Sequence, residues 1–232
     1  MARGADFLGS EWAILAGAMS WVSERNLVSA ISNAGGFGVI ACGAMTPELL
    51  DAEIGGTKAL TAKPFGVNLI TMHPQLFELI EVCGKHKVGH VVLAGGIPPK
   101  GSVEAIKASG AKVLCFAPTL ALGKKLLRSG ADALVIEGME AGGHIGPVST
   151  SVLAQEILPA VAKDIPVFVA GGIGRRHPDG CQVRSKAEKP CAASSHSRRP
   201  ARVQRLHAGQ ADAQCGTAQQ GAPQRHHRAG RR

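Results

Sequence analysis

Short apolar runs alternate with helical patterns along residues 13–174. Each run is often β-branched and ends in small residues, and the stretch after it carries apolar positions at spacings of three and four residues, which is typical of an amphipathic helix. Because the runs are apolar throughout rather than alternating with polar residues, we expect strands buried on both faces of a parallel sheet. The predicted strands are residues 14–16, 37–41, 65–69, 91–94, 112–116, 133–136 and 167–170.

The ends of three predicted helices can be located from single residues. Thr46 followed by Pro47 fits a helix N-cap with proline at the first helical position. Gly110 and Gly130 fit C-terminal caps of helices over residues 105–109 and 120–129.

Two architectures place helices on both faces of a parallel sheet: the open doubly wound sheet and the closed eight-stranded barrel. Residues 36–41 match the dinucleotide-binding pattern G-x-G-x-x-A by letters, but they run from a helix into a strand, which is the wrong context for that motif. Evenly spaced units favour a barrel, whose closure takes eight strands. We therefore predict an α/β fold, an incomplete (β/α)8 TIM-type barrel of about seven β/α units, over residues 1–174.

Residues 175–232 differ sharply from the rest of the chain. They hold 13 of the 26 Lys and Arg residues and 3 of the 17 Asp and Glu residues, a balance of +10, whereas residues 1–174 hold 13 basic and 14 acidic residues, a balance of −1. Their only large aliphatic side chains are Val183, Val203 and Leu206, so we expect a disordered, Arg-rich tail.

The tail has two further interpretations. A basic arm for nucleic acid is one, but residues 175–232 contain no Phe, Tyr or Trp to stack on bases, so we expect no nucleic-acid partner. The other starts from the abrupt end of the strand and helix pattern, which stops in the middle of a motif. We hypothesise a reading-frame shift at or near Arg175 and Arg176; translation of the other two frames past this point tests it.

The sequence gives no sign of export or membrane insertion. No apolar run reaches the ~18 residues of a membrane-spanning helix, and no signal peptide follows Met1. Cys42, Cys83 and Cys115 show no metal-binding spacing, and we predict reduced, buried thiols of a cytoplasmic protein without a metal site.

The stretch 137–146 has the features of a functional loop. It follows the apolar run 133–136, contains four glycines and His144, and precedes a helical pattern that begins near Ser151. Active sites of parallel β/α proteins lie at the carboxyl ends of strands, and histidine exchanges a proton near neutral pH. Taken alone, the stretch is equally consistent with a glycine-rich turn.

Several strand ends together resemble one protein family. The blocks are Ser-Asn-Ala-Gly-Gly-Phe-Gly at residues 32–38, Glu-Ala-Gly-Gly-His at 140–144 and Ala-Gly-Gly-Ile at 170–173. In this order they closely resemble the nitronate monooxygenases, once called 2-nitropropane dioxygenases, over roughly residues 10–174. These are FMN-dependent (β/α)8 barrels related to flavin-dependent enoyl-ACP reductases.

The resemblance implies a set of site residues. His144 faces the substrate as the catalytic residue, and the phosphate of FMN is bound by backbone N–H groups at the seventh predicted strand. The cofactor-binding residues it implies are Gly17, Ala18, Met19, Asn68, Glu137, Gly142, Gly143, Gly171 and Gly172. Asn68 as a strand cap and Gly171 with Gly172 as a tight turn remain open alternatives.

The chain departs from the family pattern in two places. The family often carries glutamine near the position of Glu137, and the family's Gly-x-Gln-x-Gly-Thr block after an eighth strand has no counterpart among residues 175–232.

The implied enzyme is an FMN-dependent oxidoreductase. It oxidises nitronates or nitroalkanes with dioxygen to a carbonyl compound and nitrite, with the His144 imidazole suited to removing the α-proton. One alternative is an FMN- and NAD(P)H-dependent enoyl-thioester reductase on the same fold. The other is an inactive, truncated barrel with exposed strand edges.

Overall fold

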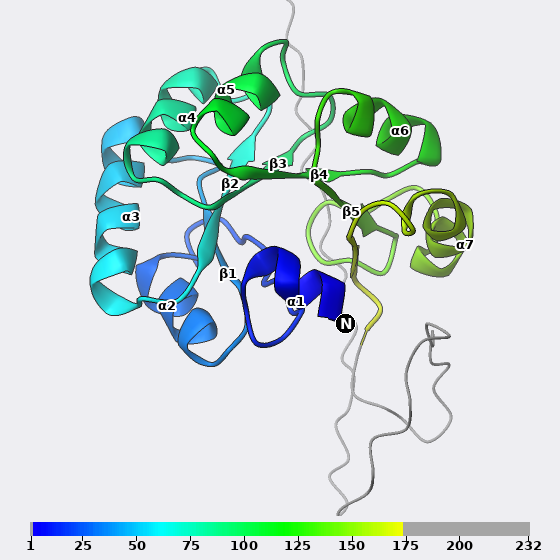
Figure 1. The fold of residues 1–232 in the computed structure, drawn as a ribbon, viewed down its shortest axis with the longest axis horizontal. Coiled ribbons are helices and arrows are strands. Elements are labelled where there is room, and N and C mark those ends of the chain that lie inside the picture. Colours follow the sequence, from blue (N-terminus) through cyan, green and yellow to red (C-terminus); the bar gives the residue numbers. More distant parts are fainter. Residues whose placement is uncertain (1, 174–232) are drawn as a thin grey trace, which may run out of the picture. The chain divides into compact units, whose positions relative to one another are not determined.

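Six parallel strands form one sheet whose spatial order is the order of the chain, β1-β2-β3-β4-β5-β6. The computed structural model describes residues 2–173. The strands are β1 (Gly38–Ala41), β2 (Phe65–Ile70), β3 (His90–Ala94), β4 (Lys112–Phe116), β5 (Ala133–Glu137) and β6 (Val167–Ala170). The sheet curls as it passes from β1 to β5 (Figure 1), and sequential parallel order with curling is the geometry of a β/α barrel, so the predicted fold class is confirmed.

The prediction of a full strand at residues 14–16 was wrong. This segment makes an isolated parallel bridge between Leu15 and Phe37, in which Ala16 N donates to Phe37 O and Phe37 N donates to Ile14 O, both at 2.9 Å. The chain then turns into a loop at Gly17, so no ladder extends beyond the bridge. The predicted tail, the frame shift and the missing eighth strand lie outside the described residues.

Seven helices occupy the connections and the amino terminus of residues 2–173. Helices α2 to α7 line the convex face of the sheet, whereas α1 lies on its concave side (Figure 1). Their bounds are α1 (Ala2–Leu8), α2 (Arg25–Asn33), α3 (Pro47–Leu60), α4 (Leu76–Lys85), α5 (Ser102–Ala108), α6 (Leu120–Arg128) and α7 (Thr150–Val161).

The predicted helix ends are confirmed. Thr46 Oγ1 accepts from Leu49 N at 3.3 Å with Pro47 as the first helical residue. Gly110 and Gly130 have φ of +85° and +99°, the left-handed conformation that glycine adopts without steric cost.

Alternate residues of each strand enter two separate cores. Val91 and Leu93 of β3 belong to the larger core between the sheet and the outer helices, while Val92 belongs to a smaller cluster on the concave face. The buried members of that inner cluster are Leu8, Phe37, Val39, Val92, Leu114, Ala133 and Val135. Burial on both faces explains why the strands read as continuous apolar runs.

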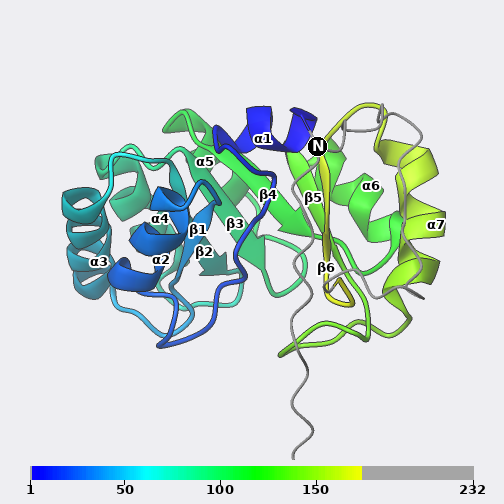
Figure 2. The same cartoon turned by 90° about the horizontal axis from the view of Figure 1, so that it is seen from below.

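Helix α1, which the sequence did not predict, closes the amino end of the concave face. Leu8 is fully buried, and Phe7 O accepts from His90 Nε2 at 2.8 Å and from Lys112 Nζ at 2.7 Å. Figure 2 shows α1 at the end of the sheet opposite the long loop that follows β5. This amino end is therefore packed and hydrogen-bonded, and the site must be sought at the other end.

Candidate active site

The predicted site residues gather at the carboxyl end of the sheet. Glu137 is the last residue of β5, Asn68 lies near the end of β2, and Gly171 directly follows β6. Because the strands are parallel, these ends share one edge. The loop over residues 17–23 joins them beside β1, since Ala41 N donates to Ser23 O at 3.0 Å.

The loop that carries His144 has a closed stem and an open tip. Gly138 O accepts from both Ala141 N and Gly146 N at 3.2 Å, and Met139 N donates to Val148 O at 2.9 Å. At the tip, Cβ atoms placed on Gly142 and Gly143 would have no heavy atom within 4 Å, and the side chain of His144 is exposed. The tip therefore has room beside it for a ligand.

Two glycines of the stem are required by close packing. A Cβ on Gly138 would lie 2.2 Å from Thr150 N, and a Cβ on Gly146 would lie 2.3 Å from Glu137 O. Both distances are far below van der Waals contact, so the glycine spacing of this loop serves its own folding as well as open space at the tip.

Asn68 and Glu137 place polar groups on the concave face. Asn68 is buried, and its Nδ2 lies 3.4 Å from Val92 O, a long hydrogen bond across the β2–β3 pair. Glu137 is partly buried; desolvation raises the pKa of its carboxyl group, and the nearby His144 partly offsets this. The concave face thus ends in an amide and a carboxyl group that make few hydrogen bonds within the described part of the chain.

Sequence reasoning missed Ser23, which braces the loop of Gly17, Ala18 and Met19. The buried Ser23 Oγ accepts from Met19 N at 3.0 Å and donates to Gly17 O at 3.2 Å. Ala18 packs against the inner cluster, and a Cβ on Gly17 would meet nothing within 4 Å. A serine six residues beyond a glycine is too common a pattern to have indicated this brace.

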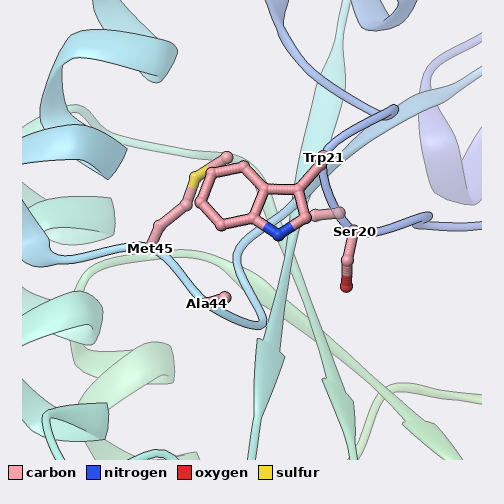
Figure 3. A pocket seen from close by; sticks show the side chains of 5 residues that line it. Ser20, Trp21, Ala44 and Met45 are labelled. Atoms are coloured by element: carbon pink, nitrogen blue, oxygen red, sulfur yellow. The ribbon is translucent and has the colours of Figure 1, made fainter.

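Trp21 holds an unusual backbone conformation beside the same loop. Its φ is +62°, which is costly for a bulky residue, and its side chain is mostly exposed. With Ser20, Ala44 and Met45 it lines a shallow hollow at the carboxyl end of β1 (Figure 3).

Gly171 and Gly172 pack against the stem of the His144 loop. Both have positive φ, +85° and +70°. A Cβ on Gly171 would lie 2.5 Å from Ala141 Cα, and one on Gly172 would lie 3.2 Å from Glu140 Cβ. This contact by itself explains the two glycines as a tight turn, and binding of a phosphate by their N–H groups stays a prediction.

Sequence reasoning also missed the contact between Glu140 and Thr150. Glu140 Oε2 accepts from Thr150 N at 2.7 Å and from Thr150 Oγ1 at 2.8 Å, and these bonds lower the pKa of the Glu140 carboxyl group.

The predicted buried thiols are confirmed: Cys42, Cys83 and Cys115 are free and buried. Residues 2–173 contain no group of three potential metal ligands and no helix long and apolar enough to cross a membrane.

The sheet is curled and parallel, and glycine-rich loops and a histidine lie at its carboxyl end. These features are typical of β/α-barrel proteins, whose functional sites lie at that end. Comparison with known sequences makes the class specific. The family described as nitronate monooxygenase matches residues 3–86 and 77–178, and the chain belongs to that family.

The relatives include oxidoreductases of different kinds. A (3aS,4S,5R,7aS)-5-hydroxy-7a-methyl-1-oxo-octahydro-1H-indene-4-carboxyl-CoA dehydrogenase of Mycobacterium tuberculosis is 38% identical over 72% of this chain and 47% of its own length. A nitronate monooxygenase of Pseudomonas aeruginosa is 30% identical over 78% of this chain and 63% of its own length. The chain thus spans between about half and two thirds of these relatives.

Two solved structures are also similar to this chain in fold and sequence. FabK from Thermotoga maritima superposes with a TM-score of 0.69 at 42% identity, over 74% of this chain and 54% of its own. A nitroalkane oxidase from Streptomyces ansochromogenes superposes with a TM-score of 0.65 at 26% identity, over 73% of this chain and 60% of its own. The family is one of oxidoreductases, so this chain comes from an enzyme family, as predicted.

Proposed function

We propose that the carboxyl end of the sheet binds FMN and that the protein is an FMN-dependent oxidoreductase acting on carbon acids, with nitronates oxidised by dioxygen to a carbonyl compound and nitrite. The observation that carries the proposal is the tip of the β5–α7 loop, where His144 stands exposed next to two glycines with open space beside them, in a chain of the nitronate monooxygenase family.

The residues at this end fit a flat, polar-edged cofactor. Gly17 and Gly142 leave room for a ring system, because no atom occupies their Cβ directions. The Asn68 amide, whose one hydrogen bond within residues 2–173 is long, has capacity for a ring heteroatom. The N–H groups of Gly171 and Gly172 are the proposed donors to the phosphate, and the positive φ at both glycines supports a backbone anion site.

FMN would supply the electron acceptor, and the protein's own groups would handle the proton. His144 in its neutral form accepts the proton from the substrate carbon α to the electron-withdrawing group. Glu137, which ends β5 on the concave face, lies near enough to His144 for their charges to interact, and this interaction partly offsets the rise that desolvation causes in the pKa of the Glu137 carboxyl group. Ser23 holds the backbone of residues 17–19 in place, and these residues would lie beside the cofactor.

The test begins with the visible spectrum of the purified chain, followed by oxygen uptake and nitrite release with propyl nitronates. We expect His144→Ala to retain flavin and lose turnover of a nitroalkane, which needs the base. His86→Ala, a change at the end of α4 that leads to the amino end of β3, is the control and should keep both. A chain without flavin bands and without bound FMN would instead be the inactive truncated barrel.

A second candidate is an enoyl-thioester reductase that takes hydride from NAD(P)H through FMN. Two observations favour it: the 42% identity to FabK, and the exposed apolar side chains on the carboxyl-end loops, which suit a long acyl chain better than a small nitronate. These side chains are Met19, Trp21, Met72, Ile97, Met139, Ile145 and Ile173. Anaerobic bleaching of the flavin by NADPH would select this reaction, and oxygen uptake with nitronates would select the first.

A further inference from the structure

Glu140 belongs to the loop that carries His144 and contacts two other parts of the proposed site, α7 and the turn after β6. Its carboxylate accepts two hydrogen bonds from Thr150, the first residue of α7. Its own backbone belongs to the stem of the loop that carries His144. Its Cβ faces Gly172, and its neighbour Ala141 faces Gly171, across the turn that follows β6.

We propose that Glu140 is a positioning residue that holds the His144 loop and the Gly171–Gly172 turn in one arrangement. The part of this proposal that concerns FMN rests on the proposed function above. The part that concerns the two loops rests on the contacts alone.

The geometry explains why a carboxylate is needed at this position. Thr150 presents two donors, its backbone N–H and its Oγ1–H, and both reach one oxygen, Oε2 of Glu140, at 2.7 and 2.8 Å. Hydrogen bonds to an ionised acceptor are stronger than those between neutral groups, and a negative charge is favoured at a helix N-terminus. The anchor on the helix side is firm, because Thr150 is buried and Ser149 Oγ caps the same helix through Val152 N.

The same contact transmits the position of α7 to the turn after β6. Gly171 and Gly172 lie so close to Ala141 and Glu140 that a Cβ on either glycine would press on the stem. A stem that shifted away from Thr150 would therefore withdraw the surface on which the turn rests. Neither glycine has a side chain with which to make a replacement contact.

The contact with Thr150 also reduces the effect of the Glu140 negative charge, which would otherwise oppose anion binding. Both hydrogen bonds from Thr150 reach Oε2 of Glu140, and the Cδ of Glu140 would lie 3.9 Å from a Cβ on Gly172. The N-terminus of α7 therefore offsets part of the negative charge beside this turn. This allows a carboxylate to stand next to a turn proposed to hold a phosphate.

The experiment compares Glu140→Ala with Glu140→Gln and with Glu156→Ala, a change of an exposed carboxylate farther along the same helix. Hydrogen–deuterium exchange of the unliganded full chain is followed in two segments, residues 138–148 and 167–173. We expect Glu140→Ala to speed exchange about tenfold in both segments, because a lost charge-assisted hydrogen bond corresponds to roughly that factor. Glu140→Gln keeps an acceptor oxygen and should restore part of the protection, and Glu156→Ala should match the wild type.

Two results would overturn the proposal. Unchanged exchange in both segments of Glu140→Ala would show that the contact holds nothing. Faster exchange in residues 138–148 alone would show that the loop and the turn are not coupled.

FMN fluorescence quenching separates this proposal from the proposed function. If the wild type binds FMN, we expect the dissociation constant to rise about tenfold in Glu140→Ala, in line with the lost bond, and to rise less in Glu140→Gln. An unchanged constant would remove the role toward the cofactor. If the wild type does not bind FMN, the proposed function fails, while the exchange data still decide the coupling.

Discussion

At the amino ends of the strands, α1 fills the concave face with the buried Leu8, and Phe7 O receives hydrogen bonds from two strands. At the carboxyl ends, glycine loops leave open space, and many of the large exposed apolar side chains of residues 2–173 lie there. One edge of the sheet therefore holds the fold together, whereas the other presents groups to a ligand. Barrels of this class divide stability and chemistry in the same way.

The largest expected effect tests whether the carboxyl end also contains residues that serve folding. Gly138→Ala places a Cβ 2.2 Å from Thr150 N, so the stem and the start of α7 cannot both keep their positions. We expect a loss of about 3 kcal/mol in the free energy of unfolding, the upper range for overpacking. Urea denaturation measures it.

Gly142→Ala is the matched control in the same loop, because its Cβ would have no atom within 4 Å. Its unfolding free energy should stay within about 0.5 kcal/mol of the wild type, while FMN binding weakens. Equal destabilisation by both changes would contradict the division between stem and tip.

The next effect tests the amino end. Leu8→Ala removes a fully buried side chain from the inner cluster, and we expect it to cost about 3 kcal/mol of unfolding free energy. Asp6→Ala, on the exposed side of the same helix, is the control. A small cost for Leu8→Ala would mean that α1 does not close this end in solution.

These two ends differ in how far the sequence predicts them. The six strands of the sheet were predicted because burial on both faces makes them continuous apolar runs. Helix α1 was missed because Ala2–Leu8 is only seven residues long, too short for a periodic signal, and is held by contacts with residues far along the chain. Residues 14–16 were predicted as a full strand but form only an isolated bridge, because an apolar run does not reveal how many residues of a neighbouring segment it pairs with.

At the candidate site, the sequence located the loop but not its construction. The glycines and His144 mark a strand-end loop, whereas the brace of Ser23 and the contact between Glu140 and Thr150 exist only after tertiary folding. The structure also distinguishes glycines that look alike in the sequence. Gly138, in the stem, is required by close packing, whereas Gly142, at the exposed tip, is not.

A smaller effect concerns pH at the amino end. His90 Nε2 donates to Phe7 O, and its buried Nδ1 has no partner among residues 2–173. Burial lowers the pKa of His90 below 6.5, and Lys112 adds to this, while the hydrogen bond to Phe7 and the charge of Asp132 oppose it. The unfolded chain therefore binds the proton more readily, so stability is complete above about pH 6.5 and falls as the pH drops below it.

We expect the wild type to lose more free energy of unfolding than His90→Gln as the pH falls from about 7.5 to about 5.5, because only the wild type has an imidazole whose proton the unfolded chain binds more readily. Glutamine can still donate to Phe7 O but does not titrate. Parallel pH profiles for the two proteins, measured by urea denaturation, would contradict the assignment.

The smallest effect concerns thiol reactivity of the outer core. Burial raises the pKa of Cys42, Cys83 and Cys115 to about 12, so almost no reactive thiolate forms near neutral pH. Iodoacetamide should label these three cysteines only after urea unfolding, as read by peptide mass spectrometry. Rapid labelling of Cys115 in the native protein would show that the core around β4 opens.

If the carboxyl end of this sheet binds FMN, titration of the purified full chain with FMN will detect the binding. We expect flavin fluorescence to be quenched until equimolar FMN is reached, and the quenching to be weaker in Gly142→Ala, whose fold persists. Absence of quenching in a chain whose far-ultraviolet circular dichroism shows a folded α/β protein would contradict it.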